Sequence, residues 1–112
     1  MSKHFQYEEF SCKCCKYTII NDHLQAVLEL VRAHFKQPVT ITSGTRCKAH
    51  NNKIGGKDAS RHLSGEAADI VVKNTRPQDV YDYIDSIFPY ALGLGNYDNF
   101  THVDVRETHA RW

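Results

Sequence analysis

The segments Ser60–Asp69 and Thr101–Asp104 carry the side chains of this chain that are best suited to chemistry. Together they supply two imidazoles and one carboxylate, at His62, Asp69 and His102. A catalytic zinc ion commonly takes three nitrogen or oxygen ligands from the protein and keeps a fourth position for water. If these three side chains converge, the sequence predicts a metal site that can activate water for hydrolysis.

The second segment predicts a strand with a polar face. Residues i and i+2 of a strand share a face, so His102, Asp104 and Arg106 are expected to point the same way. A stripe of His, Asp and Arg in an otherwise β-branched strand is costly to bury unless its members have partners. A metal ion and the groups that orient its ligands would provide those partners.

Each of the three residues also has a simpler interpretation. His62 fits an exposed loop, Asp69 fits a turn or cap, and His102 fits a hydrogen-bonded core histidine. The chain has seven histidines, and most of them are expected to have no special role. The histidines assigned no metal role are His4, His23, His34, His50 and His109. Only the joint pattern of the other two with Asp69 favours a metal site.

Two amphipathic helices are predicted to support this site. Asn21–Asp22 is a credible N-cap for a helix that runs to about Lys36. The apolar face of that helix recurs at helical spacing, in Leu24, Val27, Leu28, Val31 and Phe35. Pro77 suits the first turn of a second helix, which Pro89 closes.

Short strands are predicted around residues 39–42, 67–72, 91–94 and 101–105, and a short helix over residues 47–54. Helices and strands in this proportion predict an α+β domain, in which two main helices pack on a small, mostly antiparallel sheet. A length of 112 residues is expected to form one domain over 1–112, with an N-terminal arm over about 1–20.

Composition narrows the class of protein. The formal net charge of +1 gives no bias toward nucleic acid or anionic membranes, and the basic stretch Lys48, Lys53 and Lys57 has no interleaved aromatic residues. No apolar run reaches the roughly 20 residues that span a bilayer. The first ten residues show no hydrophobic core of a signal peptide, so we expect synthesis in the cytoplasm. We also expect a monomer.

Three of the four cysteines lie close together in the sequence. Cys12, Cys14 and Cys15 precede the first helix, and Cys47 follows the first strand. Cys12 and Cys15 form a C-x-x-C motif, but no second pair follows at zinc-ribbon spacing. The simplest interpretation is four thiols without a chemical role, because a cytoplasmic origin disfavours disulfides. A structural metal or a disulfide, with Cys47 approaching the other three, is the alternative.

The motif Ser60-x-His62-x-x-Gly65-x-Ala67-x-Asp69, with the later His102-Val103-Asp104, resembles the zinc D-Ala-D-Ala carboxypeptidase family. Phage endolysins and bacterial peptidoglycan endopeptidases are among its members. The likeness extends upstream through residues 41–46 and downstream to the terminal residues 110–112, so it covers nearly the whole chain. It implies the α+β fold that these peptidases share with the signalling domain of hedgehog proteins.

The resemblance implies roles for particular residues. His62, Asp69 and His102 would hold one zinc ion. Arg46 would lie beside the metal and stabilise the oxyanion of the tetrahedral intermediate, where a fixed cation contributes strongly to catalysis. Ser60 would bind the carboxylate or backbone of the substrate, and the alternative for it is a hydroxyl that caps a turn.

The general base departs from the family pattern. Many relatives place Glu, Asp or His three residues before the second zinc histidine, where this chain has Asn99, and an amide is not a useful proton acceptor. Asp98 could substitute through a different loop register, and Asp104 could act as the base or as a partner of the metal ligands. Both possibilities stay open, with Glu66 and His109 as further candidates.

The implied activity is zinc-dependent hydrolysis of an amide bond in the peptide stem of bacterial peptidoglycan. Three bonds remain open: D-Ala-D-Ala at the end of the stem, a D,D cross-link, or L-Ala-D-Glu. The small size and the lack of a signal peptide favour a phage or prophage lysis enzyme that reaches the cell wall through a holin-like partner. The alternative is a non-catalytic zinc-containing module that binds the cell wall or another protein.

Overall fold

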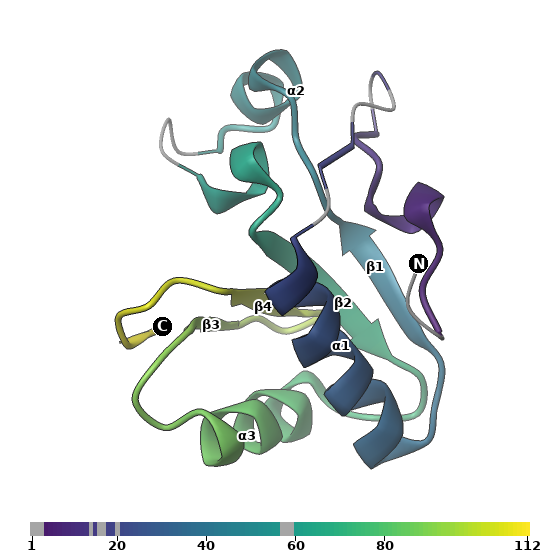
Figure 1. Ribbon diagram of the computed structural model, residues 1–112, viewed down its shortest axis with the longest axis vertical. Coiled ribbons are helices and arrows are strands. Elements are labelled where there is room, and N and C mark those ends of the chain that lie inside the picture. Colours follow the sequence, from purple (N-terminus) through teal and green to yellow (C-terminus); the bar gives the residue numbers. More distant parts are fainter. Residues whose placement is uncertain (1–3, 14, 16–17, 20, 57–59) are drawn as a thin grey trace.

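The computed structural model describes residues 4–13, 15, 18–19, 21–56 and 60–112. Its centre is a five-stranded sheet with the order β1-β2-β4-β3-β5 (Figure 1). The neighbouring strands pair antiparallel, except that β3 and β5 are parallel. The strands are β1 Val39–Ser43, β2 Ala67–Val72, β3 Gly93–Asn96, β4 Thr101–Asp104 and β5 Ala110–Arg111. The predicted α+β class with a mostly antiparallel sheet is confirmed.

The two predicted main helices are confirmed as α1 Asp22–Phe35 and α3 Pro77–Ile87. Asn21 caps α1, because its side chain accepts a hydrogen bond from the Leu24 N–H at 2.9 Å. Helix α1 ends at Phe35, and the following cap residue, Lys36, adopts the left-handed conformation (φ 56°) more often taken by glycine. None of the helices in the described ranges is long and apolar enough to cross a membrane.

Both main helices cover the same face of the sheet. Alternate residues of β2 and their neighbours on β3 and β4 point toward the helices and are buried: Ala68, Ile70, Val72, Leu94 and Val103. The helices contribute side chains from one apolar stripe each, such as Leu28 of α1 and Ile84 of α3, to the same core. The residues between those of the strands therefore face away from the helices.

Three small elements were not predicted from the sequence. They are the 3₁₀ helices η1 Tyr7–Phe10 and η2 Arg61–Ser64 and the two-residue strand β5. Elements this short have no hydrophobic period to detect. Strand β3 begins two residues later than predicted, at Gly93, because Leu92 has a positive φ of 66° and cannot extend the strand. The short helix is α2, Lys48–Lys53.

The described part of the N-terminal arm packs against the sheet. Phe5 and Phe10 are buried in the core, and the Thr45 N–H donates to the Phe10 carbonyl at 2.8 Å. At Gly44 a side chain would meet the backbone of Phe10, with a Cβ only 2.8 Å from its carbonyl oxygen. The close approach of the arm to the end of β1 therefore requires glycine at position 44.

Candidate metal centre

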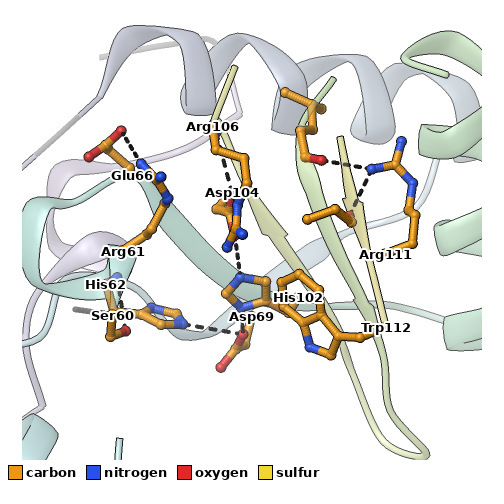
Figure 2. Close-up of polar contacts among 12 residues, drawn as sticks. Ser60, Arg61, His62, Glu66, Asp69, His102, Asp104, Arg106, Arg111 and Trp112 are labelled. Atoms are coloured by element: carbon orange, nitrogen blue, oxygen red, sulfur yellow. Dashed lines mark hydrogen bonds and ion pairs between the residues drawn. The ribbon is translucent and has the colours of Figure 1, made fainter. Parts of the chain in front are cut away.

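The pairing of β2 with β4 places two of the predicted ligands side by side. Asp69 lies directly opposite His102 in the antiparallel register, and Ala67 lies opposite Asp104. Directly opposite residues share a face, which here is the face away from the helices. His102 Nδ1 lies 2.9 Å from Asp69 Oδ1 (Figure 2).

The helix η2 brings the third predicted ligand to the same point. The Ser60 hydroxyl caps η2 by accepting the His62 N–H at 3.3 Å, and the helix ends at Gly65, which has a φ of 73°. The His62 ring is buried, and its Nδ1 donates to the Gly44 carbonyl at 2.7 Å. This bond selects the tautomer that leaves the Nε2 lone pair available, and Nε2 lies 3.4 Å from Asp69 Oδ1.

The donor set fits one zinc ion. One atom from each of His62, Asp69 and His102 lies within 4.8 Å of the other two. Two ligands bound tetrahedrally at zinc–nitrogen and zinc–oxygen distances lie about 3.4 Å apart. The observed separations of 3.4 Å and 2.9 Å from Asp69 are close to that value. Two imidazoles and a carboxylate also form a typical catalytic zinc set.

The charges at this point favour an ionised carboxylate. Burial raises the pKa of Asp69, but its hydrogen bonds with His102 and His62 outweigh burial and lower the pKa to about 2. Burial lowers the pKa of His102, but hydrogen bonds with Asp104 and Asp69 outweigh burial and raise the pKa above its ordinary value. A cation that binds here must displace the proton on His102 Nδ1.

Asp104 holds the far side of the His102 ring. Its Oδ2 lies 2.9 Å from His102 Nε2, and Arg106 donates to both carboxylate oxygens at 2.7 and 2.8 Å (Figure 2). Asp104 is fully buried. Burial raises its pKa, but the bonds with His102 and Arg106 hold that pKa well below the usual value. A carboxylate that accepts the second N–H of a ligand histidine sets the orientation and tautomer of that ring.

Two glycines of β3 leave room for these side chains. Gly93 lies opposite Asp104 in the β3–β4 pair, and Gly95 lies opposite His102. A Cβ at Gly93 would collide with the Asp104 carboxylate, and a Cβ at Gly95 would lie 2.6 Å from the Trp112 indole nitrogen. The floor of the site therefore depends on the absence of side chains along β3.

The guanidinium of Arg46 contacts the carboxylate ligand Asp69. Its Nη2 lies 3.4 Å from Asp69 Oδ2, its Nη1 donates to the Asn51 side chain at 3.3 Å, and its Nε donates to the Ser43 hydroxyl at 3.2 Å. Its backbone N–H donates to the His62 carbonyl at 2.8 Å. Burial lowers the pKa of Arg46 more than the Asp69 charge raises it, yet a guanidinium remains charged at neutral pH.

These groups open into one cleft of about 740 Å³. Tyr97, Phe100 and Trp112 form an aromatic wall that the sequence analysis did not assign to the site. The Tyr97 and Phe100 rings stack 4.4 Å apart, and the Trp112 indole N–H donates to the Tyr97 hydroxyl at 2.9 Å. The cleft is lined by Arg46, Gly55, Gly56, Ser60, Arg61, His62, Asp69, Tyr97, Phe100, His102, Asp104, Arg106 and Trp112.

The C-terminal strand carries Trp112 to the metal centre. The Trp112 and His102 rings lie 5.2 Å apart, and the Arg106 guanidinium lies 5.3 Å from the Trp112 ring centre. Arg111 holds this strand against the rest of the domain, since its side chain donates to the Asp85 carboxylate at 2.7 Å and to the Leu92 carbonyl at 2.7 Å. Strand β5 has only two residues and shows no hydrophobic period, so the sequence did not predict this aromatic wall.

The other candidates for the base lie apart from the ligands. Asp98 is exposed in the turn between β3 and β4, next to Tyr97, and it is not among the residues that line the cleft. Glu66 accepts hydrogen bonds from Ser64 at 2.6 Å and from Arg61 at 3.4 Å. His109 is exposed just before β5. Within the described cleft lining, Asp69 and Asp104 are the only carboxylates.

Comparison with protein-family models matches residues 3–104 to the model described as Peptidase M15. The matched range contains His62, Asp69, His102 and Arg46. A search of curated proteins found no match.

Proposed function

The chain belongs to the Peptidase M15 family, which consists of metallopeptidases, and on that premise we propose that it is a zinc-dependent peptidase of the bacterial cell wall. Its substrate would be an amide bond in the peptide stem of peptidoglycan. The observation that carries the proposal is the convergence of His62, Asp69 and His102 within 4.8 Å at the floor of an open cleft. The resemblance of the Ser60–Asp69 motif to the D-Ala-D-Ala carboxypeptidases supports the substrate class.

His62 Nε2, a carboxylate oxygen of Asp69 and His102 Nδ1 would hold the zinc ion. When bound there, zinc supplies Lewis-acid chemistry, which activates water and polarises a carbonyl group. The Gly44 carbonyl and the Asp104 carboxylate hold the two rings from behind, at 2.7 and 2.9 Å. Each imidazole therefore presents one defined nitrogen to the ion.

Arg46 would stabilise the negative charge that develops on the scissile carbonyl oxygen. Its guanidinium is already fixed by Ser43, Asn51 and Asp69, so no reorganisation is needed during the reaction. A preorganised cation in a partly buried cleft is worth more than the same charge in water.

We assign different roles to the two candidate bases. Asp104 is a positioning residue, because a buried carboxylate paired with Arg106 and His102 has a strongly lowered pKa and is a poor proton acceptor. Asp98 is the proposed proton acceptor. Its side chain is exposed and does not line the cleft in this structure, but its turn neighbours Tyr97 and Phe100 do. A base role for Asp98 therefore requires this turn to bring the carboxylate into the cleft when substrate binds.

The cleft suits a short peptide with free carboxylates. Three arginines, Arg46, Arg61 and Arg106, line it against two carboxylates, Asp69 and Asp104. Ser60 offers a hydroxyl, and the aromatic wall of Tyr97, Phe100 and Trp112 offers an apolar side. Peptide stems of peptidoglycan combine small apolar residues with carboxylates. We extend the proposal to a role as a phage or prophage lysis enzyme that acts on the wall after release from the cytoplasm.

The test is digestion of purified peptidoglycan by the zinc-loaded protein, with mass spectrometry of the released fragments. His102→Ala serves as the inactive variant and His109→Ala as the matched control, since His109 is exposed and does not line the cleft. The proposal is supported if the wild type and His109→Ala release zinc-dependent fragments and His102→Ala releases none. The new termini of the fragments would identify the bond that is cut. If the zinc-loaded wild type binds wall fragments without cutting them, the alternative of a non-catalytic binding module is favoured. The presence of Asn99 at the position where relatives carry the general base is consistent with that alternative.

A further inference from the structure

A second group of metal-binding side chains lies apart from the histidines. The sulphur atoms of Cys12, Cys15 and Cys47 all lie within 4.8 Å of one another. Cys12 and Cys15 belong to the N-terminal arm, whereas Cys47 follows β1 and caps α2. Cys14 lies outside the described residues. We propose that these three cysteines hold a second, structural zinc ion that fastens the arm to the segment carrying Arg46.

The spacing of the three sulphurs suits a metal better than a disulfide. Sulphurs bound tetrahedrally at a zinc–sulphur distance of about 2.3 Å lie about 3.8 Å apart, so small side-chain adjustments would close the triangle. A disulfide joins only two sulphurs, at about 2.0 Å. A zinc ion can bind all three sulphurs at once.

The backbone around the cluster supports thiolates, the form in which cysteine binds zinc. The Cys47 N–H donates to the Cys12 sulphur at 3.4 Å, and the His50 N–H donates to the Cys47 sulphur at 3.4 Å. Two sulphurs of the triangle thus already receive hydrogen bonds that stabilise negative charge. These donors belong to the backbone and hold their direction without side-chain ordering.

Positive side chains stand next to the cluster. A pocket beside it is lined by Cys15 and Cys47 together with Arg46 and Lys48. Three thiolates and one zinc ion carry a net charge of −1, which these cations partly balance. On binding, each thiol releases one proton to solvent and forms one sulphur–zinc bond, so three protons leave for each ion.

The three cysteines of the cluster differ in their exposure to solvent. Cys12 is buried, at 1% exposure, Cys47 is half-buried, and Cys15 is exposed. An ion can therefore enter past Cys15 and still be held by a buried ligand. A fourth ligand, either water or another side chain, would complete the usual four-coordinate arrangement.

Such an ion would steady the histidine site through the chain between them. Gly44 supplies the carbonyl that fixes His62, and Arg46 faces Asp69, so the segment 44–47 links both sites. The arm contacts the same segment through the Thr45 hydroxyl, which donates to the Ile19 carbonyl at 2.9 Å. The proposed zinc ion would link the arm to Cys47, at the end of this segment, more strongly than the hydrogen bond of Thr45 does.

The test is the zinc content of the purified chain, measured by elemental analysis after dialysis against zinc and then against buffer. We expect two zinc ions per wild-type chain, one in Cys15→Ser, and one in His102→Ala. Cys15 is exposed, so its replacement leaves the core intact, and Ser11→Ala in the same arm is the matched control and should keep two ions.

Cobalt(II) substitution identifies the ligands of each ion. Cobalt–thiolate bonds give an intense charge-transfer band in the near ultraviolet, which His102→Ala should keep and Cys15→Ser should weaken strongly. A wild type with one zinc ion that is lost in His102→Ala would overturn the proposal. A disulfide among the three cysteines, found by mass spectrometry of the unreduced chain, would overturn it too. Both results leave the proposed peptidase function standing, because that function depends on zinc at the histidine site and not at the cysteines.

Discussion

Asp69 and His102 face each other across the β2–β4 pair, with His102 Nδ1 2.9 Å from Asp69 Oδ1. They are 33 residues apart in the sequence. Their contact depends on strand register, since a shift of one residue would turn either side chain toward the helices. The metal centre is therefore built into the sheet, and only His62 arrives from outside it, on η2.

Replacing Asp104 tests its role as a positioning residue. Asp104→Asn keeps the size of the side chain but removes the charge that holds the His102 tautomer, so we expect zinc affinity at the histidine site to fall about 10- to 100-fold. A competition titration with a chromophoric chelator measures it. Unchanged zinc affinity together with a large loss of kcat would instead make Asp104 the base.

Replacing Asp98 tests the proposed proton acceptor. Asp98→Asn should lower kcat by about 10²- to 10⁴-fold, the usual contribution of a general base, while zinc content stays the same. Asn99→Ala, in the same turn, is the matched control, and equal losses in both variants would contradict the assignment.

Replacing Arg46 tests the oxyanion role. Arg46→Ala should lower kcat by about 10²- to 10³-fold and change KM much less, because the guanidinium acts mainly on charge that develops in the transition state. Zinc content is measured alongside, since Arg46 also contacts Asp69. Arg61→Ala removes another cleft arginine and should have a smaller effect on kcat. A change confined to KM would assign Arg46 to substrate binding.

A methyl group at position 93 tests the floor of the site. In Gly93→Ala the new Cβ collides with the Asp104 carboxylate, so the pair with Arg106 must shift. We expect a loss of stability of about 1–3 kcal/mol, as for other overpacked positions, together with weaker zinc binding. Denaturant unfolding of the zinc-free protein measures the first effect. If Gly93→Ala has the same stability and zinc affinity as the wild type, the strand must relax without disturbing Asp104, which would contradict this prediction.

Zinc binding at the histidine site should depend on pH in a defined direction. Burial lowers the pKa of His102, but hydrogen bonds with Asp104 and Asp69 outweigh burial and raise it above its ordinary value, so a proton competes with zinc for Nδ1 as the pH falls. Zinc affinity should therefore fall as pH decreases, about tenfold per unit for each proton displaced, and level off above the pKa. Titrations between about pH 5 and 8 measure the slope. Affinity that does not change across this range would contradict His102 as a ligand.

The local elements could be predicted because the sequence carries their signals directly. The Asn21 cap, the apolar stripe Leu24–Val31 and Pro77 each act within a few residues, and the structure confirms both helices. The family resemblance, carried by the motif around His62 and Asp69, is also confirmed. The local predictions that were wrong concern short or strained segments. Strand β5 is too short to show a hydrophobic period, and β3 begins later than predicted because Leu92 has a positive φ.

The sequence by itself determined the two helices, most of the strands, the α+β class and the set of candidate ligands, because these follow from local spacing and residue type. Only the tertiary structure decided the strand order, which pairs Asp69 with His102 and Asp104 with Gly93. It also decided the approach of Trp112 to the cleft and the gathering of Cys12, Cys15 and Cys47. These contacts join distant segments, and their geometry depends on how the whole core packs, which no local pattern of residues encodes.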